Sequence, residues 1–442
     1  MDENELMGSM KVSKAVAKMA IPSVISSLVT VVYNMADTFF VGQTGDPLQV
    51  AAVSQTNPIF ILFMAFANMF GMGGSAAASM ALGEKKEKRV KQVSSFITYA
   101  SLIVGIVFAV ILLAGMQPVL QLFGADADTY ELAKGYTTYI SYGAPFIIWS
   151  AAASFVVRSD GASREAMTGS MIGTVANIIL DPIFISGFGM GAAGAAIATT
   201  IGNIMASVYY LWYFCRKSRN MSMAFRYFKC GDRILSQVCS AGLPTAIFSA
   251  LMSISTIILN QILVAYGNAP VAAIGIVFKA NMFITFLQMG LANGVQPLLG
   301  YSYGAGNRER FITVERYTKK CCLIVGVLAT ALFFFFREPI IRLFISDTEV
   351  INYGVEMLIA YMISGPVIGI LFMNMNCMQS TGNALPATIL SILRQGVLLI
   401  PVLYGLNALL GLHGVIYGQA LTDYVAVLLS IVIWRWKRRK TL

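Results

Sequence analysis

Long apolar stretches separated by short polar stretches recur along the whole chain. Each apolar stretch has about 20 residues or more, and a helix of that length crosses the hydrocarbon core of a bilayer. Helices are expected because a helix pairs its own backbone groups, whereas lipid offers them no partner. The pattern therefore predicts an all-α integral membrane fold with about twelve transmembrane helices, near residues 15–41, 50–81, 93–115, 132–156, 166–187, 191–214, 234–265, 271–302, 318–336, 352–377, 386–409 and 413–434.

The composition supports a membrane protein and argues against an enzyme. The chain is 57% hydrophobic and 12% charged, which lies outside the range of soluble domains. It has no GxxxxGK[ST] phosphate loop, no clustered Ser, His and Asp, and no metal-ligand spacing. We therefore expect neither nucleotide hydrolysis nor another enzymatic reaction, and no cofactor or metal.

The charged residues follow the predicted loops in a regular way. The net charge is +10, but the basic residues gather in alternate loops, as in GEKKEKRVK at 83–91 and WRWKRRK at 434–440. The intervening loops carry acids and few bases. Because basic loops stay cytoplasmic, both termini are expected in the cytoplasm and the number of spans is expected to be even. This placement makes nucleic acid an unlikely partner.

The chain reads as a duplication. Short segments recur at a nearly constant offset of about 221 residues, for example AIPSV with GLPTA at 20–24 and 242–246, QLFGAD with RLFISD at 121–126 and 342–347, and VRSDG with MQSTG at 157–161 and 378–382. We expect an N-lobe at 1–215, a cytoplasmic linker at 216–233 and a C-lobe at 234–442, each lobe with six helices. Parallel repeats around a central cavity are typical of alternating-access transporters.

A few charged residues fall inside predicted spans: Asp37, Asp181, Lys279, Glu356, Arg394 and Asp423. A charge at the centre of a membrane helix costs about 2.5–3.5 kcal/mol on insertion scales. Such residues are functional candidates by default, and ion pairing is the structural alternative.

Asp37 and Asp181 are the strongest candidates. Both lie in spans that run outward, at similar depth in the outer half of the membrane, and their counterparts in the second half are apolar. Pro182 follows Asp181 at once and predicts a break in the helix beside the acid. Polar residues accompany the two acids at helical spacing: Tyr33 and Asn34, Thr174 and Asn177, and Thr199 and Asn203.

This cluster predicts a site that couples transport to a cation. A desolvated carboxylate can be tuned to take up and release a proton, and the same oxygens with Asn and Thr partners can hold sodium instead. A static hydrogen-bonded network that pins the helices together is the structural alternative.

The other intramembrane charges have simpler interpretations. Arg394 and Asp423 fall at similar depth in the last two spans, which predicts a structural ion pair. Lys279 lies deep in the eighth span and either pairs with a carboxylate or repels cations from the second half. Some of the 24 methionines can line an adaptable substrate cavity rather than fill apolar space. The candidates for the wall of that cavity are Lys279, Met64, Met69, Met282, Met289 and Met373.

Over essentially its whole length the chain resembles the multidrug and toxic compound extrusion (MATE) transporters. The resemblance rests on AIPSVISSLVTVVYNMADTFFVG at 20–42, SYGAGNRER at 302–310 and RSDGASREAMTGSMIGTVANIILDPIFISGFGMGAAGAAIAT at 158–199. It implies a monomer with two six-helix lobes in a prokaryotic plasma membrane. It also implies export of cationic or amphiphilic organic compounds in exchange for protons or sodium.

The resemblance also assigns residues. Asp37 matches the acid of the family's first helix, and Asp181 with Asn177 matches the N-lobe site of its DinF-like branch, with Tyr33 and Thr199 as network partners. The seventh span lacks the glutamate of the NorM-like branch, so a cation site of that kind is not expected in the C-lobe. The alternative is a flippase of the same superfamily that moves a lipid-linked oligosaccharide.

Overall fold

The computed structural model describes residues 5–44, 46–124 and 126–441, and these residues form helices and short connections. Among these residues, eleven helices are long and apolar enough to cross a membrane, and the pair Thr348–Ile363 and Gly365–Ser380, bent by 44°, brings the number to twelve when it is counted as one broken span. The predicted all-α membrane fold with twelve spans is therefore confirmed.

The first half of the described chain contains seven α-helices and two short π-helical segments. In chain order they are η1 (Glu5–Ser9), α1 (Val12–Gly42), α2 (Pro47–Gly83), α3 (Glu87–Ala114), α4 (Met116–Leu122), α5 (Tyr130–Ser159), α6 (Ser163–Pro182), η2 (Ile183–Gly187) and α7 (Gly191–Arg216). The short helix α4 lies between two spanning helices and was not predicted.

The second half follows a polar connection that contains a single 3₁₀ turn, η3 (Phe225–Tyr227). Its helices are α8 (Ile234–Val264), α9 (Asn268–Gly304), α10 (Arg308–Phe335), α11 (Arg337–Arg342), α12 (Thr348–Ile363), α13 (Gly365–Ser380), α14 (Ala384–Ile392), η4 (Leu393–Leu398), α15 (Leu399–Leu410) and α16 (Leu412–Thr441). The largest difference from the predicted spans is at α10, which begins at Arg308 rather than near 318 because its charged first turns precede the apolar stretch.

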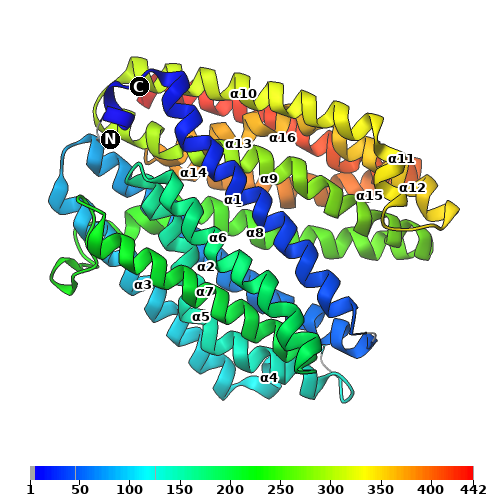
Figure 1. Ribbon diagram of the computed structural model, residues 1–442. Coiled ribbons are helices and arrows are strands. Elements are labelled where there is room, and N and C mark those ends of the chain that lie inside the picture. The colour runs from blue at the N-terminus through cyan, green and yellow to red at the C-terminus, as the bar shows by residue number, and fades with distance from the viewer. Residues whose placement is uncertain (1–4, 45, 125, 442) are drawn as a thin grey trace.

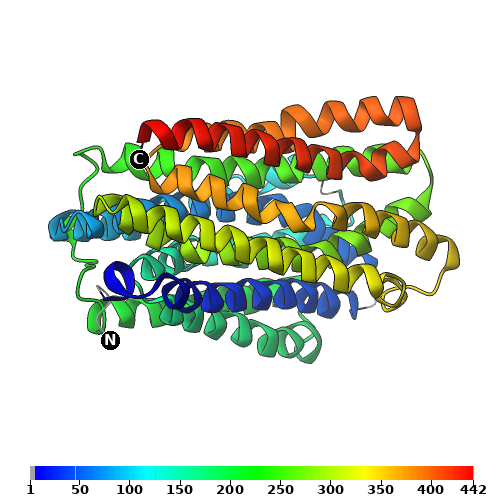
Figure 2. The same ribbon diagram turned by 90° about the horizontal axis from the view of Figure 1, so that it is seen from above.

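The helices form two bundles. Figure 1 shows α2–α7 in one bundle and α8–α16 in the other, with α1 running between them. In the view from above, the long helices run in roughly the same direction and both termini lie at one end (Figure 2). Helix α1 packs against α6 of the first bundle and α9 of the second, and α2 packs against α8 and α9. Helices α1 and α2 therefore carry most of the contact between the bundles.

Glycines bring the two bundles into close contact. A Cβ atom added at Gly73 of α2 or at Gly242 of α8 would lie 1.9 Å from a backbone oxygen of the facing helix. The same holds for Gly83 of α2 and Gly304 of α9, at 2.2 Å and 2.1 Å. Only glycine permits such an approach of two backbones. We call these four residues the glycine seam.

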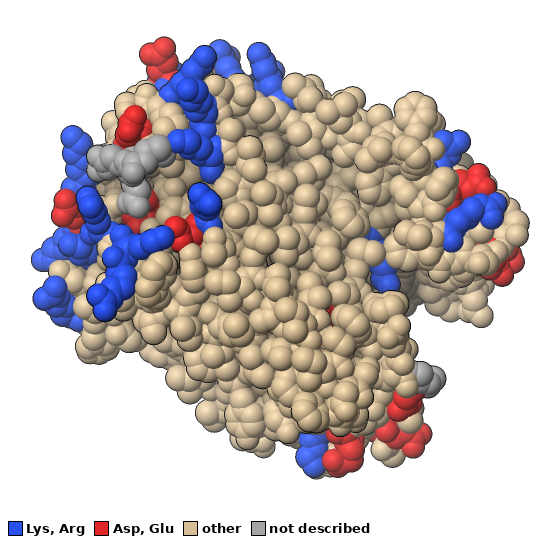
Figure 3. All heavy atoms as spheres, viewed as in Figure 1, with Lys and Arg blue, Asp and Glu red and all other residues tan. Residues whose placement is uncertain are grey.

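The seam and the termini share one end of the molecule. The guanidinium of Arg310, on α10, donates hydrogen bonds to backbone oxygens of Leu6, Met7 and Met10, and so ties the N-terminal segment to the second bundle at that end. Figure 3 shows Lys and Arg side chains gathered there, and a notch between the bundles at the opposite end. The bundles thus touch at the basic end and separate at the other.

Candidate functional site

Asp181 lies at the end of α6 in the first bundle. Its side chain is fully buried, at 0% exposure. The next residue is Pro182, after which the helix continues as the π-helical segment η2. Proline has no N–H to donate and crowds the preceding turn, so the helix changes its form directly beside the acid, where a break was predicted.

A chain of polar groups connects Asp181 to two other helices. In the orientation that gives each amide atom a complementary partner, Asn177 Nδ2 donates to Asp181 Oδ2 at 2.9 Å. Asn177 Oδ1 then accepts from the backbone N–H of Thr199 at 2.9 Å and from its hydroxyl at 3.1 Å. The Thr199 hydroxyl lies 3.3 Å from that of Tyr33. The chain therefore runs from α6 through α7 to α1.

One oxygen of Asp181 is left over. Its Oδ1 atom is buried and has no hydrogen-bond partner among the described residues. Asp37 lies one turn beyond Tyr33 on α1 and is partly buried. The end of α1 meets η2 here, because Val41 and Ile185, each four residues beyond one of the two acids, share a hydrophobic cluster. Within residues 5–44, 46–124 and 126–441, neither acid forms an ion pair with a basic side chain. A buried carboxylate without a base costs free energy unless it binds a proton or another cation.

The outer part of this network reaches α5. Asn203 donates from Nδ2 to the Thr199 backbone oxygen at 2.9 Å, and Ser150 donates to Asn203 Oδ1 at 2.9 Å. Thr174 shares a helix face with Asn177 but forms no hydrogen bond with the described residues. We call Tyr33, Asp37, Asn177, Asp181, Thr199 and Asn203 the N-lobe network.

Two neighbours of this network were missed. Ser150 and Tyr136 both come from α5: Ser150 donates to Asn203, and Tyr136 packs against the cluster of Val41, Ile185 and Ala195 next to the two acids. Each is a polar residue in a predicted span, which is the signal that could have found them. Sequence spacing relates residues on one helix, however, and does not say which helix lies next to α6.

The second bundle holds the predicted pair of Arg394 and Asp423. Nε of Arg394, in η4, lies 2.8 Å from Oδ1 of Asp423, on α16, and both side chains are buried. Lys279 is partly buried on α9 and forms no ion pair with the described residues. Glu356 has a partner: its Oε1 atom lies 2.6 Å from Nδ1 of His413.

The candidate methionines occupy different surroundings. Met282 lines a cavity beside Arg394 and Asp423. Met64, Met69 and Met289 are partly buried and pack against hydrophobic clusters. Met373 is fully buried in the core of the second bundle.

Comparison with known proteins places this architecture in a family. The family model MatE matches residues 22–183 and again residues 244–404, in agreement with the duplication. The multidrug export protein MepA of Staphylococcus saprophyticus is 32% identical over 422 residues, which cover 96% of this chain and 93% of that protein. MepA of Staphylococcus aureus strain NCTC 8325 gives the same identity and coverage.

Solved structures agree over the whole length. A multidrug resistance MATE family transporter in an outward-facing conformation has a TM-score of 0.94 at 25% identity, covering 100% of this chain and 98% of that one. A transporter from Pyrococcus furiosus, described as having a binding pocket of reverse polarity, has a TM-score of 0.92 at 26% identity, with coverage of 99% and 98%. The chain therefore belongs to the MatE family, and it is a multi-pass membrane transporter with two lobes rather than an enzyme.

Proposed function

We propose that this protein exports cationic or amphiphilic organic compounds by alternating access, in exchange for a proton or a sodium ion bound at Asp37 and Asp181. The observation that carries the proposal is the surrounding of Asp181: a fully buried carboxylate with one unpartnered oxygen, a second acid nearby and no paired base. Its similarity to proteins named as multidrug exporters supports the choice of cargo.

The N-lobe network explains how one site can serve both substrates. The free Oδ1 of Asp181 and the oxygens of Asn177, Thr199 and Tyr33 offer a cation a polar environment from three helices. Occupation by a cation stabilises the buried acid. A positively charged drug that approaches the two carboxylates competes for the same charge, so each favours release of the other.

The arrangement of the lobes supports alternating access. On the positive-inside rule the basic end, with both termini, faces the cytoplasm. The glycine seam is closed at that end, and the notch between lobes is open at the other (Figure 3), so the structure corresponds to an outward-facing state. In this proposal the chain consists of an N-lobe (1–215), a linker (216–233) and a C-lobe (234–442). It acts as a monomer and belongs to the DinF-like branch of the family.

The test is efflux of a fluorescent cationic dye from proteoliposomes, under an imposed pH gradient and separately under a sodium gradient. We expect one of the two gradients to drive efflux by the wild-type protein and by Asp128→Asn, which removes an exposed loop acid. Asp181→Asn should fold and insert into the membrane but lose driven efflux. Efflux driven by neither gradient, with insertion verified, would contradict the proposal, and transbilayer movement of a lipid-linked oligosaccharide would be measured next.

A further inference from the structure

The C-lobe contains a cavity that the ion-coupling proposal does not use. Its volume is about 260 Å³, and it lies among α8, α9, α12, α13, the η4–α15 segment and α16. Arg394 and Asp423 form part of its wall, and the aromatic side chains of Phe248, Phe278 and Tyr361 lie among the aliphatic and polar side chains that form the rest. Small-ligand pockets are typically about 300–1,000 Å³ and apolar with a few polar groups. This cavity lies just below that range, so it suits only a compact molecule such as a small aromatic one.

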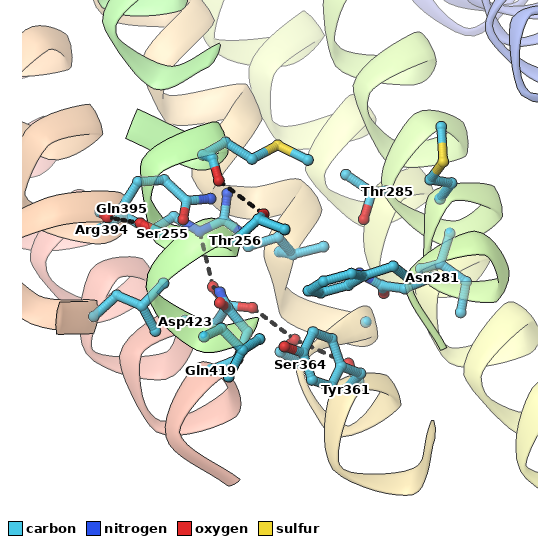
Figure 4. A pocket seen from close by; sticks show the side chains of 18 of the residues that line it. Ser255, Thr256, Asn281, Thr285, Tyr361, Ser364, Arg394, Gln395, Gln419 and Asp423 are labelled. Carbon is cyan, nitrogen blue, oxygen red and sulfur yellow. Dashed lines mark hydrogen bonds and ion pairs between the residues drawn. The ribbon is translucent and has the colours of Figure 1, made fainter. Parts of the chain in front are cut away.

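Asp423 and Arg394 differ in how many of their hydrogen-bonding groups have partners. Asp423 accepts three: from Arg394 Nε at 2.8 Å, from Gln419 Nε2 at 3.0 Å and from the Ser364 hydroxyl at 2.9 Å (Figure 4). Among the described residues, Arg394 donates a hydrogen bond to Asp423 alone, and its buried Nη1 atom has no partner. A guanidinium has five N–H donors. The Asp423 carboxylate is therefore satisfied, whereas Arg394 lies in the cavity wall with N–H donors that the described residues leave unused.

The guanidinium is held in a fixed plane. Its central carbon lies 5.3 Å from the ring centre of Phe248 and 5.6 Å from that of Phe372, within the range of cation–π contacts. Together with the bond from Nε, these rings fix the direction of the remaining N–H groups before any ligand arrives. A planar donor group fixed in this way matches a carboxylate, which accepts two parallel hydrogen bonds.

The opposite wall supplies further polar groups. Asn281 and Thr285 lie one turn apart on α9, across the cavity from Arg394 and Asp423 in Figure 4. Neither side chain forms a hydrogen bond with the part of the chain that the structure describes. Both are therefore available to a polar substituent at the far end of a bound molecule.

The N-lobe has nothing equivalent at the corresponding positions. At the offset of about 221 residues, Arg394 and Asp423 correspond to Gly173 and Gly202. A Cβ added to Gly173 would lie 2.8 Å from the Gly202 backbone oxygen, and one added to Gly202 would lie 2.5 Å from that of Gly173. The two helices touch there, so there is room for neither charges nor a ligand.

We propose that this C-lobe cavity is a second ligand site, which binds small aromatic carboxylates or zwitterions by hydrogen bonds from Arg394 to the carboxylate. The ring lies among the aromatic side chains, and Asn281 and Thr285 contact its far end. Asp423 neutralises Arg394 when the site is empty, which makes the pair a part of the ligand site and not only a link between η4 and α16. Binding here does not depend on the cation bound in the N-lobe.

The test is equilibrium binding to the full-length protein in nanodiscs, measured by isothermal titration calorimetry. The probes are 1-naphthoate, its amide 1-naphthamide and the cation 1-naphthylmethylammonium, which share one ring system. We expect wild type to bind 1-naphthoate best and the cation worst. The double variant Arg394→Gln with Asp423→Asn removes both charges without stranding either, and should bind 1-naphthoate at least about tenfold more weakly.

Two further variants keep the result interpretable. Thr285→Ile fills the opposite wall without touching the ion pair and should also weaken 1-naphthoate. Arg342→Gln removes an exposed arginine, 57% accessible in its pair with Glu338, and should bind like wild type, as should Asp181→Asn. Equal binding of 1-naphthoate by wild type and the folded double variant would overturn the proposal. So would equal or tighter binding of the cation, loss of binding in Asp181→Asn, or no binding by wild type, and the pair would then be structural only.

Discussion

In the N-lobe, Asp181 is buried and, among the described residues, has no basic partner and one unpartnered oxygen. In the C-lobe, Asp423 is buried 2.8 Å from Arg394 and accepts three hydrogen bonds. Both acids are buried within a bundle of transmembrane helices. The difference is that the described part of the protein supplies the Asp423 carboxylate with a positive charge and with hydrogen-bond donors to both oxygens, whereas it leaves one oxygen of Asp181 without a partner. On the proposed function, the Asp181 carboxylate is completed by a proton or sodium ion from outside.

The two lobes show that a duplicated scaffold does not fix the position of its charges. The position that holds Asp181 in the N-lobe corresponds to Val402, and the position of Arg394 corresponds to Gly173. Helix lengths and order are retained, because burial of apolar residues and backbone pairing specify them in both halves. Buried charges are costly, so each persists only where it has a partner or a use. The lobes therefore differ in their buried charges: two acids in the N-lobe, which we propose bind a cation, and an ion pair beside a cavity in the C-lobe.

The same chemical change in the two lobes should have opposite effects, and the largest is on transport. Asp181→Asn removes a titratable group but replaces it with a side chain of equal size, so we expect driven dye efflux to fall at least about tenfold with the melting temperature unchanged or higher. Asp37→Asn should act in the same direction. Wild-type efflux by both purified variants would remove the N-lobe site from the account.

In the C-lobe the corresponding substitution should affect stability. Asp423→Asn leaves Arg394 charged and buried without its acid, which costs about 3–5 kcal/mol. The measurement is thermal unfolding in detergent. Adding Arg394→Gln to Asp423→Asn removes the stranded charge and should restore most of the loss. If the single and double variants unfold alike, the pair is not the electrostatic unit described here.

At the glycine seam, unlike at the two buried sites, the same substitution should have the same effect whichever lobe carries it. Gly73→Val and Gly242→Val each place a Cβ atom within van der Waals overlap of the facing backbone, so the basic end must open. We expect the melting temperature to fall by about 5 °C and Cys239, which is adjacent to the seam and partly buried, to react faster with maleimide. Gly275→Val, with no heavy atom within 4 Å of the new Cβ, is the control.

The smallest effect is expected within the N-lobe network. Thr199→Val removes the hydroxyl that joins Asn177 to Tyr33 but keeps both acids. Loss of about 1 kcal/mol of hydrogen bonding corresponds to roughly a fivefold decrease in driven efflux. Thr199→Ser retains the hydroxyl and should stay close to wild type. Equal loss in both variants would point to packing rather than to the hydroxyl.

The sequence predicted the twelve spans because their length and apolarity are set by the membrane, and the duplication gave the two lobes. The connection from Asn177 to Asp181 followed from helical spacing, since both lie on α6. What spacing cannot give is contact between helices that are distant along the chain, and so the contributions of Tyr136 and Ser150 were missed. The sequence also could not predict that Nη1 of Arg394 has no partner among the described residues. A pattern that pairs two charges does not show which N–H groups of the arginine stay unbonded.

The most direct test of the central claim is whether ligand binding displaces a cation at Asp181. Binding of the cationic dye to the purified protein would be followed by calorimetry in buffers of different ionisation enthalpy, which reports protons released, and at increasing sodium concentration, which reports sodium displaced. The account predicts release of a proton or competition by sodium in the wild-type protein, and neither in Asp181→Asn. Dye binding that shows neither effect in wild type, or the same effect in both proteins, would contradict it.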